Sequence, residues 1–294
     1  IALDPGNLTY RVDYAKIIYE HEDNPEAAIG FLREILKDYP DHPQVLGAIA
    51  IYYRRSGQLK YFEDTKKEIM NLPNKDTTFY TFMMEAAQLD ENTDLVISYG
   101  RELLKLEQGN LNVRMQVAKT LYEKGDLQQA LLELEEIKRK LPSYPRLYYY
   151  LSKIYSVQGK IDLSLEMAKK EVESNPTLEY GHIQLGNIYT QKEQFSEAQN
   201  AFETAQKING KSVEALMGLA WIKYRQNHVE SALDLYTKAA QLDQGNPLVH
   251  KQLGFVYKAI GQHILAVQEF KTYLDLSPNA DDRAKIQSYI DLLQ

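Results

Sequence analysis

The sequence contains no cysteine, which excludes structural disulfides and thiolate metal sites. It also lacks any apolar run approaching the ~20 residues that a membrane-spanning helix needs. Positive charge is in deficit: 34 Lys and Arg oppose 41 Asp and Glu, giving a net charge of −7. This balance argues against bulk attraction to nucleic acid or to an anionic membrane. The lack of cysteine does not separate a cytosolic from a periplasmic location.

Motifs for catalysis and cofactor binding are missing as well. The sequence has no G-x-G-x-x-G, no Walker-type glycine loop and no G-x-S-x-G. Its six histidines are scattered, and none has metal-ligand spacing. His182 and His250 fall at a packing position, which favours a core or edge role over ligation. We therefore expect neither enzymatic activity nor a metal or other cofactor.

What the sequence does have is a 34-residue period, present eight times without insertion or deletion. One position of the period is occupied by Ala28, Phe62, Val96, Ala130, Ser164, Ala198, Ala232 and Ala266. Another is occupied by Tyr19, Tyr53, Ala87, Leu121, Tyr155, Tyr189, Lys223 and Tyr257. A period of this length is typical of stacked repeats, in which each unit contacts its neighbours and the array offers a long surface rather than an enclosed site.

Within each unit, helical spacing and turn residues predict an antiparallel helix pair. The same turn position holds Gly57, Gly125, Gly159 and Gly261, and glycine there suits a left-handed helix end. The same terminal position holds Pro40, Pro142, Pro176 and Pro278. Pro43, Pro145 and Pro247 are expected at the first position of a helix, whereas Pro5, Pro25 and Pro73 are expected in turns.

These residues resemble the tetratricopeptide repeat, which has a Leu-Gly or Leu-Ala pair and a Tyr in its first helix, Ala and an aromatic residue in its second, and a closing Pro. Leu185, Gly186, Tyr189, Ala198 and Phe202 match this pattern well. The resemblance covers residues 9–280. It implies an all-α fold, a right-handed superhelical α-solenoid of antiparallel helix pairs. It also implies that first helices line a concave groove in which extended peptides commonly bind.

The period defines the predicted organisation of the chain. Residues 1–8 are interpreted as the tail of a preceding repeat, and residues 281–294 as a C-terminal solvating helix with an apolar stripe. The eight repeats are predicted at 9–42, 43–76, 77–110, 111–144, 145–178, 179–212, 213–246 and 247–280. Phe62, Val96 and Gly100 depart from the pattern, and either drift with local repacking or a hinge between the second and fourth repeats explains them.

Transferring the family geometry to repeats four to eight gives a candidate binding groove. Its predicted residues are Lys119, Tyr122, Arg146, Tyr149, Tyr150, Lys153, Tyr180, Asn187, Trp221, Tyr224, Arg225, Lys251, Phe255 and Lys258. Six of these are basic, whereas only Glu123 and Glu214 are acidic at such positions. Basic and aromatic residues together favour an acidic or carboxylate-bearing peptide with hydrophobic anchors.

Other interpretations of the groove remain open. The tyrosines could pack against neighbours, and the cations could keep an open face hydrated. The family's two-carboxylate clamp is absent around Asn187, where Ile183, Gly218, Leu248 and Gln252 occupy the other required positions. The leading prediction is a scaffold that binds a partner protein or extended peptide in the groove, without nucleic acid. The alternatives are a structural scaffold of a secretion or envelope assembly, or the recruiting arm of a larger enzyme.

Overall fold

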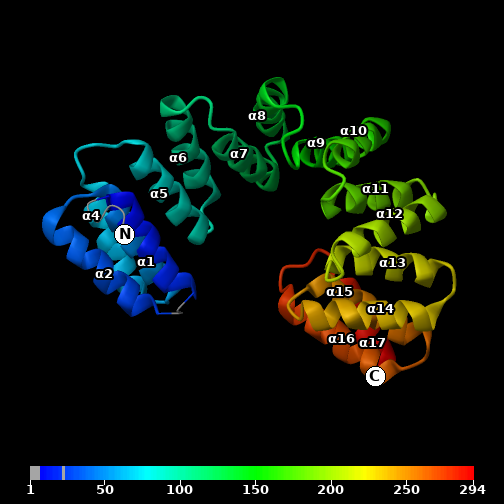
Figure 1. Ribbon diagram of the computed structural model, residues 1–294. Helices are drawn as coiled ribbons and strands as arrows, with labels where there is room; N and C mark the ends of the chain where they lie inside the picture. The colour runs from blue at the N-terminus through cyan, green and yellow to red at the C-terminus, as the bar shows by residue number, and fades with distance from the viewer. Residues whose placement is uncertain (1–6, 22–23) are drawn as a thin grey trace. The chain divides into compact units, whose positions relative to one another are not determined.

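The computed structural model describes residues 7–21 and 24–294, and in these residues the regular elements are 17 α-helices (Figure 1). The first helices of successive pairs are α1 (Leu8–His21), α3 (Pro43–Arg55), α5 (Thr77–Leu89), α7 (Leu111–Lys124), α9 (Leu147–Val157), α11 (Glu179–Gln191), α13 (Val213–Arg225) and α15 (Pro247–Ala259). The second helices are α2 (Pro25–Asp38), α4 (Leu59–Met70), α6 (Thr93–Leu106), α8 (Leu127–Lys140), α10 (Ile161–Ser174), α12 (Phe195–Ile208), α14 (Val229–Leu242) and α16 (His263–Leu276). The predicted all-α fold of helix pairs is confirmed.

From α3 onward, the turn inside each helix pair is the same. Gly57, Gly125, Gly159 and Gly261 all have positive φ, as the sequence predicts. The residue after each glycine donates its N–H to the carbonyl five positions back, as Gln262 does to Tyr257 at 2.9 Å. Three non-glycine residues share this conformation: Glu91, Glu193 and Asn227, at φ 54°, 57° and 63°. The backbone thus adopts one helix-ending turn whichever residue occupies the left-handed position.

Two expectations for proline are wrong. Pro25 does not lie in a turn but opens α2, where Asn24 caps the helix by accepting the N–H of Ala27 at 3.0 Å. Pro145 does not open a helix, because α9 begins only at Leu147 after Arg146 has turned to φ 65°. Residues 1–6 of the predicted N-terminal tail lie outside the described residues, and Leu8 already belongs to α1. The division into eight repeats stays a prediction.

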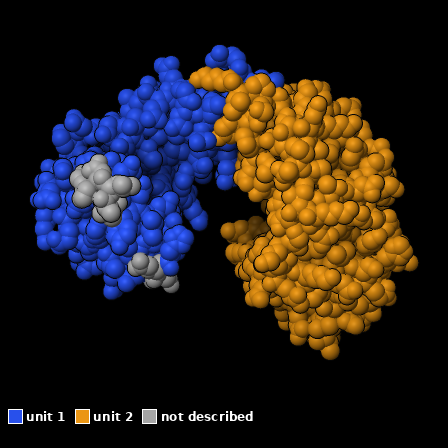
Figure 2. All heavy atoms as spheres, viewed as in Figure 1, with its two compact units in different colours: residues 1–139 blue, residues 140–294 orange. Residues whose placement is uncertain are grey.

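The helices form two compact units, residues 1–139 (unit 1) and 140–294 (unit 2) (Figure 2). In each unit, consecutive first helices contact one another: α1 with α3 and α3 with α5 in unit 1, α9 with α11 and α11 with α13 in unit 2. Consecutive second helices make no comparable contacts in the described parts of the chain. Each unit therefore curves with its first helices on the inside, and we call this surface its inner face.

Close packing within and between helix pairs depends on small residues opposite large ones. In unit 2, Gly186 and Gly218 both lie against the buried ring of Phe202, and Gly254 lies against Phe270. A Cβ added at Gly254 would lie 2.5 Å from Phe270, so these rings occupy space that a side chain would need. In unit 1 the unusual Phe62 and Val96 are buried, and Val117 packs directly against Gly100.

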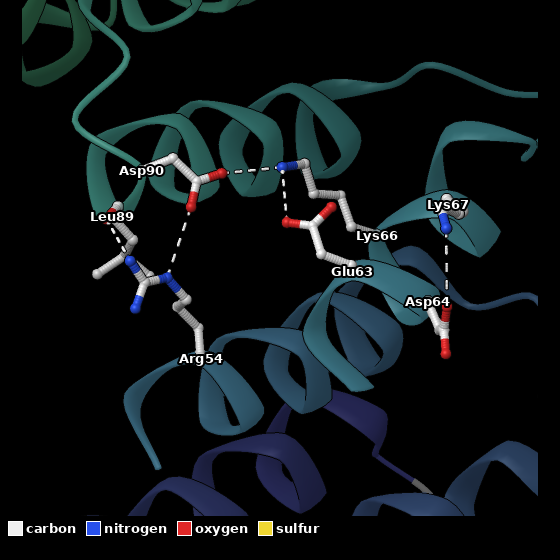
Figure 3. Close-up of polar contacts among 7 residues, drawn as sticks. All are labelled: Arg54, Glu63, Asp64, Lys66, Lys67, Leu89 and Asp90. Atoms are coloured by element: carbon white, nitrogen blue, oxygen red, sulfur yellow. Dashed lines mark hydrogen bonds and ion pairs between the residues drawn. The ribbon is translucent and has the colours of Figure 1, made fainter. Parts of the chain in front are cut away.

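A cluster of charges joins three helices of unit 1 (Figure 3). Asp90, directly after α5, accepts a hydrogen bond from Lys66 of α4 at 2.8 Å and lies 3.5 Å from Arg54 of α3. Arg54 also donates to the carbonyl of Leu89 at 2.9 Å. Burial opposes the charge of Lys66, but Asp90 and Glu63 raise its pKa. This cluster fixes the end of α5 against the preceding helix pair.

The chain ends in α17 (Arg283–Leu293), which packs Ile286 and Ile290 against α16. Tyr289 and Leu293 complete the apolar stripe and are half-buried. None of the described helices combines the length and apolar composition needed to cross a membrane.

Candidate functional site

The predicted site residues fall in both units. Lys119 and Tyr122 lie on α7 of unit 1, whereas the other twelve lie in unit 2 on α9, α11, α13 and α15 or directly before α9. Lys119 is 3.7 Å from the carboxylate of Glu123, four residues later on the same helix. The candidate site is therefore the group of predicted residues on the inner face of unit 2.

Cations of this face lie over aromatic rings. The guanidinium of Arg146 is 4.0 Å from the ring centre of Tyr180, and that of Arg225 is 5.3 Å from Trp221. The ammonium groups of Lys153 and Lys258 are 5.3 Å and 4.1 Å from the rings of Tyr149 and Tyr289, respectively. Such stacking holds a cation in place without neutralising it.

The charge available to a ligand is smaller than the sequence predicts. Lys251 pairs with Asp282 at 3.0 Å, and Asp282 also accepts the hydroxyl of Tyr273 at 2.5 Å. Asp282 lies after the last predicted repeat, so it was not among the acidic residues predicted from the 34-residue period. Arg146, Arg225 and Lys258 form no ion pair with any residue that the structure describes. These three cations remain able to attract a carboxylate.

A pocket of about 440 Å³ opens on the inner face between α11, α13 and α15. We call it the Trp221 pocket, and its lining includes Asn187, Trp221, Met217, Leu248 and Gln252. Leu248 is 50% exposed although it is a large apolar residue. Asn187 is exposed too, and its amide can both donate and accept a hydrogen bond. An apolar side chain and a polar backbone could be held here together.

Phe195 extends this surface beside the pocket. It opens α12 and packs against Trp221 with ring centres 5.8 Å apart. The guanidinium of Arg225 lies 5.9 Å from the Phe195 ring, so it is close to both aromatic rings. The family geometry predicts that first helices line the groove, whereas Phe195 lies on a second helix, so the sequence did not indicate this residue.

Arg146 owes its position to a buried carboxylate. Glu171 of α10 is fully buried, and its oxygens accept the N–H groups of Arg146 at 2.9 Å, Tyr148 at 3.0 Å and Tyr149 at 3.2 Å. Asn175 donates a fourth hydrogen bond at 3.1 Å. Glu171 thus caps α9 in place of a local side chain, and the backbone of Arg146 turns left-handed to meet it.

Glu171 is also a titratable group under two opposing influences. Burial raises the pKa of its carboxyl, and the donated hydrogen bonds of α9 and Asn175 oppose that rise. The period carries a signal that could have revealed this residue. At the same position the other repeats hold Ile35, Ile69, Leu103, Ile137, Ala205, Ala239 and Tyr273, all buried. A charged residue in a core position indicates a specific partner.

Three predicted aromatic residues serve packing. Tyr150 is only 8% exposed, so it offers a ligand little surface. Phe255 packs edge-on against Phe270 at 5.1 Å, and Tyr224 joins the core between α13 and α15. Tyr149 is half-buried, and its pKa is raised by burial and then by the charge of Glu214.

The two histidines at the predicted packing position are half-buried. His250 lies 2.7 Å from Glu269 through Nδ1 and 3.0 Å from the carbonyl of Gln244 through Nε2. His182 lies 3.4 Å from the carbonyl of Pro176. No group of three or more His, Asp or Glu that could hold a metal ion occurs in residues 7–21 and 24–294.

Helix pairs stacked in this way define an α-solenoid, the class of protein to which the chain belongs. Residues 183–247, which include the α11–α14 region around the Trp221 pocket, match the family described as "Tetratricopeptide repeat". This match agrees with the predicted resemblance to that family, and the helix pairs outside residues 183–247 share the same fold.

Similar proteins share modest identity with the chain. Human "Protein IFIT1 homolog B" is 25% identical over 172 residues, covering 58% of this chain and 33% of the relative. "Mitochondrial import receptor subunit TOM70" of Saccharomyces cerevisiae strain ATCC 204508 / S288c is 24% identical over 200 residues, covering 59% and 32%. The chain thus spans about a third of the length of these relatives.

A solved structure supports the fold. "Crystal structure of APC/C hetero-tetramer Cut9-Hcn1" matches with a TM-score of 0.68 at 15% identity, covering 97% of this chain and 55% of that one. At this identity the match establishes the arrangement of helices alone.

Proposed function

We propose that the chain is a protein-interaction scaffold and that the inner face of unit 2 holds an extended segment of a partner protein. The observation that carries the proposal is the Trp221 pocket beside an unpaired Arg225. An apolar side chain of the partner enters the pocket, and a neighbouring carboxylate meets the guanidinium. Buried aromatic anchors and arginines dominate the energy of many protein interfaces.

The stacked cations give the bound segment its preferred charge. Arg146, Arg225 and Lys258 occur on or next to three different first helices, so they would meet successive parts of an extended chain. Asn187 is exposed near the centre of this surface and can hydrogen-bond a backbone amide. The expected partner segment is therefore acidic, with at least one large apolar residue among its carboxylates.

The test uses a fluorescein-labelled peptide of alternating Glu and Leu, with fluorescence anisotropy as the readout. Trp221→Ala should weaken binding about tenfold, and Arg225→Gln about fivefold, because they remove the anchor contact and the charge contact, respectively. Affinity should fall as salt is raised, since the cations are at least partly exposed.

The matched control is Lys160→Gln. Lys160 also stacks on a ring, 5.8 Å from that of Tyr155, but it occupies the position directly before α10 instead of lying on a first helix. Its substitution should leave the affinity unchanged. Equal losses in Lys160→Gln and Arg225→Gln would refute the site, as would tighter binding of a single-stranded oligonucleotide through Trp221. If the chain still recovers its partner protein in a pull-down when it carries Trp221→Ala or Arg225→Gln, the alternative function of an assembly scaffold is favoured.

A further inference from the structure

Unit 1 contains a second cavity, of about 490 Å³, which no predicted site residue lines. It lies on the inner face between α1, α3 and α5, and we call it the unit 1 pocket. Val12, Ile51 and Phe82 line it as buried apolar residues. The small residues Gly47 and Ala48 of α3 also line it.

The charge of this pocket is the opposite of that in unit 2. Four carboxylates line it, from Asp13, Glu20, Glu85 and Glu107, against the two cations Lys16 and Arg55. Both cations already have partners: Arg55 is 3.2 Å from Glu85, and Lys16 is 4.0 Å from Glu20. The pocket therefore keeps an excess of negative charge after its internal pairs are made.

Two of the carboxylates are not neutralised. Asp13 makes neither an ion pair nor a side-chain hydrogen bond with the residues that the structure describes. Glu107 accepts a hydrogen bond from the uncharged amide of Asn110 at 2.9 Å. Tyr52 also lines this acidic pocket, and its pKa is raised to about 12 by burial and then by the charge of Glu20.

We propose that the unit 1 pocket binds a lysine or arginine side chain carried by an extended basic segment of a protein partner. The aliphatic stem lies along Val12, Ile51 and Phe82, and the cationic head reaches Asp13 or Glu107. Charge complementarity selects a cationic group, and the apolar lining selects one attached to a stem rather than a small inorganic cation. This site is independent of the one proposed in unit 2, because it uses other residues and the opposite charge.

The experiment measures binding of a fluorescein-labelled peptide of alternating Lys and Leu to the full chain. The variant Asp13→Asn plus Glu107→Gln removes both uncompensated charges and breaks no ion pair, and the new amide oxygen at position 107 can still accept from Asn110. We expect its affinity for the peptide to fall about tenfold. The exposed Thr81 also lines the pocket, and Thr81→Phe, which fills the space without changing charge, should cause a comparable loss.

The control must separate the pocket from the overall charge of −7. Asp38→Asn plus Glu68→Gln removes two exposed carboxylates from α2 and α4, outside the pocket. This variant should bind the basic peptide within about twofold of the unmodified chain, since screened distant charges contribute little. Circular dichroism of each variant confirms that it is folded.

Three results would overturn the proposal. The first is equal affinity of the control and pocket variants for the basic peptide. The second is displacement of the peptide by spermidine at a concentration equal to the dissociation constant of the peptide. This result would indicate a site for free polyamines. The third is a loss of basic-peptide binding in Arg225→Gln. Because the unit 2 proposal is tested with an acidic peptide and other variants, each proposal can fail alone.

Discussion

Unit 1 and unit 2 share one backbone plan, yet their inner faces hold charge in different ways. In unit 1, Lys16 and Arg55 face carboxylates, and acidic residues remain in excess. In unit 2, Arg146, Arg225 and Lys258 rest on aromatic rings and keep their charge available. The repeat thus determines where an inward side chain is placed, whereas substitution at those positions determines which ligand the face attracts.

The largest effect is expected from removing Glu171, a carboxylate buried in the core of unit 2. Glu171→Ala leaves the N–H groups of Arg146, Tyr148 and Tyr149 without their acceptor. We expect the free energy of unfolding of unit 2 to fall by about 3 kcal/mol. Urea titration measures this loss, and hydrogen exchange should locate it at the start of α9.

Glu166→Ala provides the control for that substitution. Glu166 lies on the same helix and pairs with Lys170 at 2.7 Å, but its side chain is 52% exposed. Its loss should cost less than about 0.5 kcal/mol. Unchanged amide protection in α9 of Glu171→Ala would contradict the capping role.

A second comparison concerns how tightly glycine packs against an aromatic ring in each unit. In Gly254→Ala the new Cβ would lie 2.5 Å from Phe270, which is fully buried and has no free space to move into. In Gly47→Ala the nearest atom of Phe82 would be 3.2 Å away. We expect losses of about 2 kcal/mol and below about 1 kcal/mol, respectively, as shifts in the urea midpoint. The reverse order would show that unit 1 is the more rigidly packed.

The turns inside the helix pairs should respond alike in both units. Glu91 in unit 1 and Glu193 in unit 2 occupy the left-handed position where glycine is free of strain. Glu91→Gly and Glu193→Gly should each stabilise the chain by about 0.5–1 kcal/mol, observed as a higher Tm. Gly159→Ala, at the same position, should destabilise it. Opposite signs in the two glutamate variants would mean that the turns are not equivalent.

The smallest expected effect is a dependence on pH. Because burial raises the pKa of Glu171 above its ordinary value of 4.5, the folded chain holds this proton more tightly than the unfolded chain does. Glu171 therefore contributes most stability below pH 4.5, and that contribution declines as pH rises through the folded pKa. The difference in unfolding free energy between the unmodified chain and Glu171→Gln should decline in that direction. A difference that grows with pH would indicate a lowered pKa instead.

The 34-residue period was sufficient to predict the fold because it reports packing directly. A column of small residues such as Ala28 and Ala198 can only be the place where two helices cross closely, and both are fully buried. The glycine column likewise predicted the left-handed turns. The period could not predict the start of α9. The N–H of Arg146 donates to Glu171, 25 positions later in the sequence, and α9 begins after Arg146 instead of at the position that the period predicts.

The candidate site was predictable only in part for a similar reason. Helical position predicts that Asn187 and Trp221 both face inward, and in the structure both line the Trp221 pocket. Helical position gives no information about contacts between side chains. Lys251 was therefore predicted to be an available charge, although it pairs with Asp282. Helical position also overlooked the unit 1 pocket, since residues such as Asp13 and Glu107 become neighbours only through the stacking of three helix pairs.

The turn glycines have a practical consequence. A Cβ added at Gly57 or Gly261 would have no heavy atom within 4 Å apart from those of the glycine and its chain neighbours, so both positions are open. The sequence has no cysteine, and a thiol introduced beside either turn would be unique in the molecule. An environment-sensitive dye attached there would report on one helix pair at a time. Occupancy of the unit 1 pocket and of the Trp221 pocket could then be followed separately in a single chain.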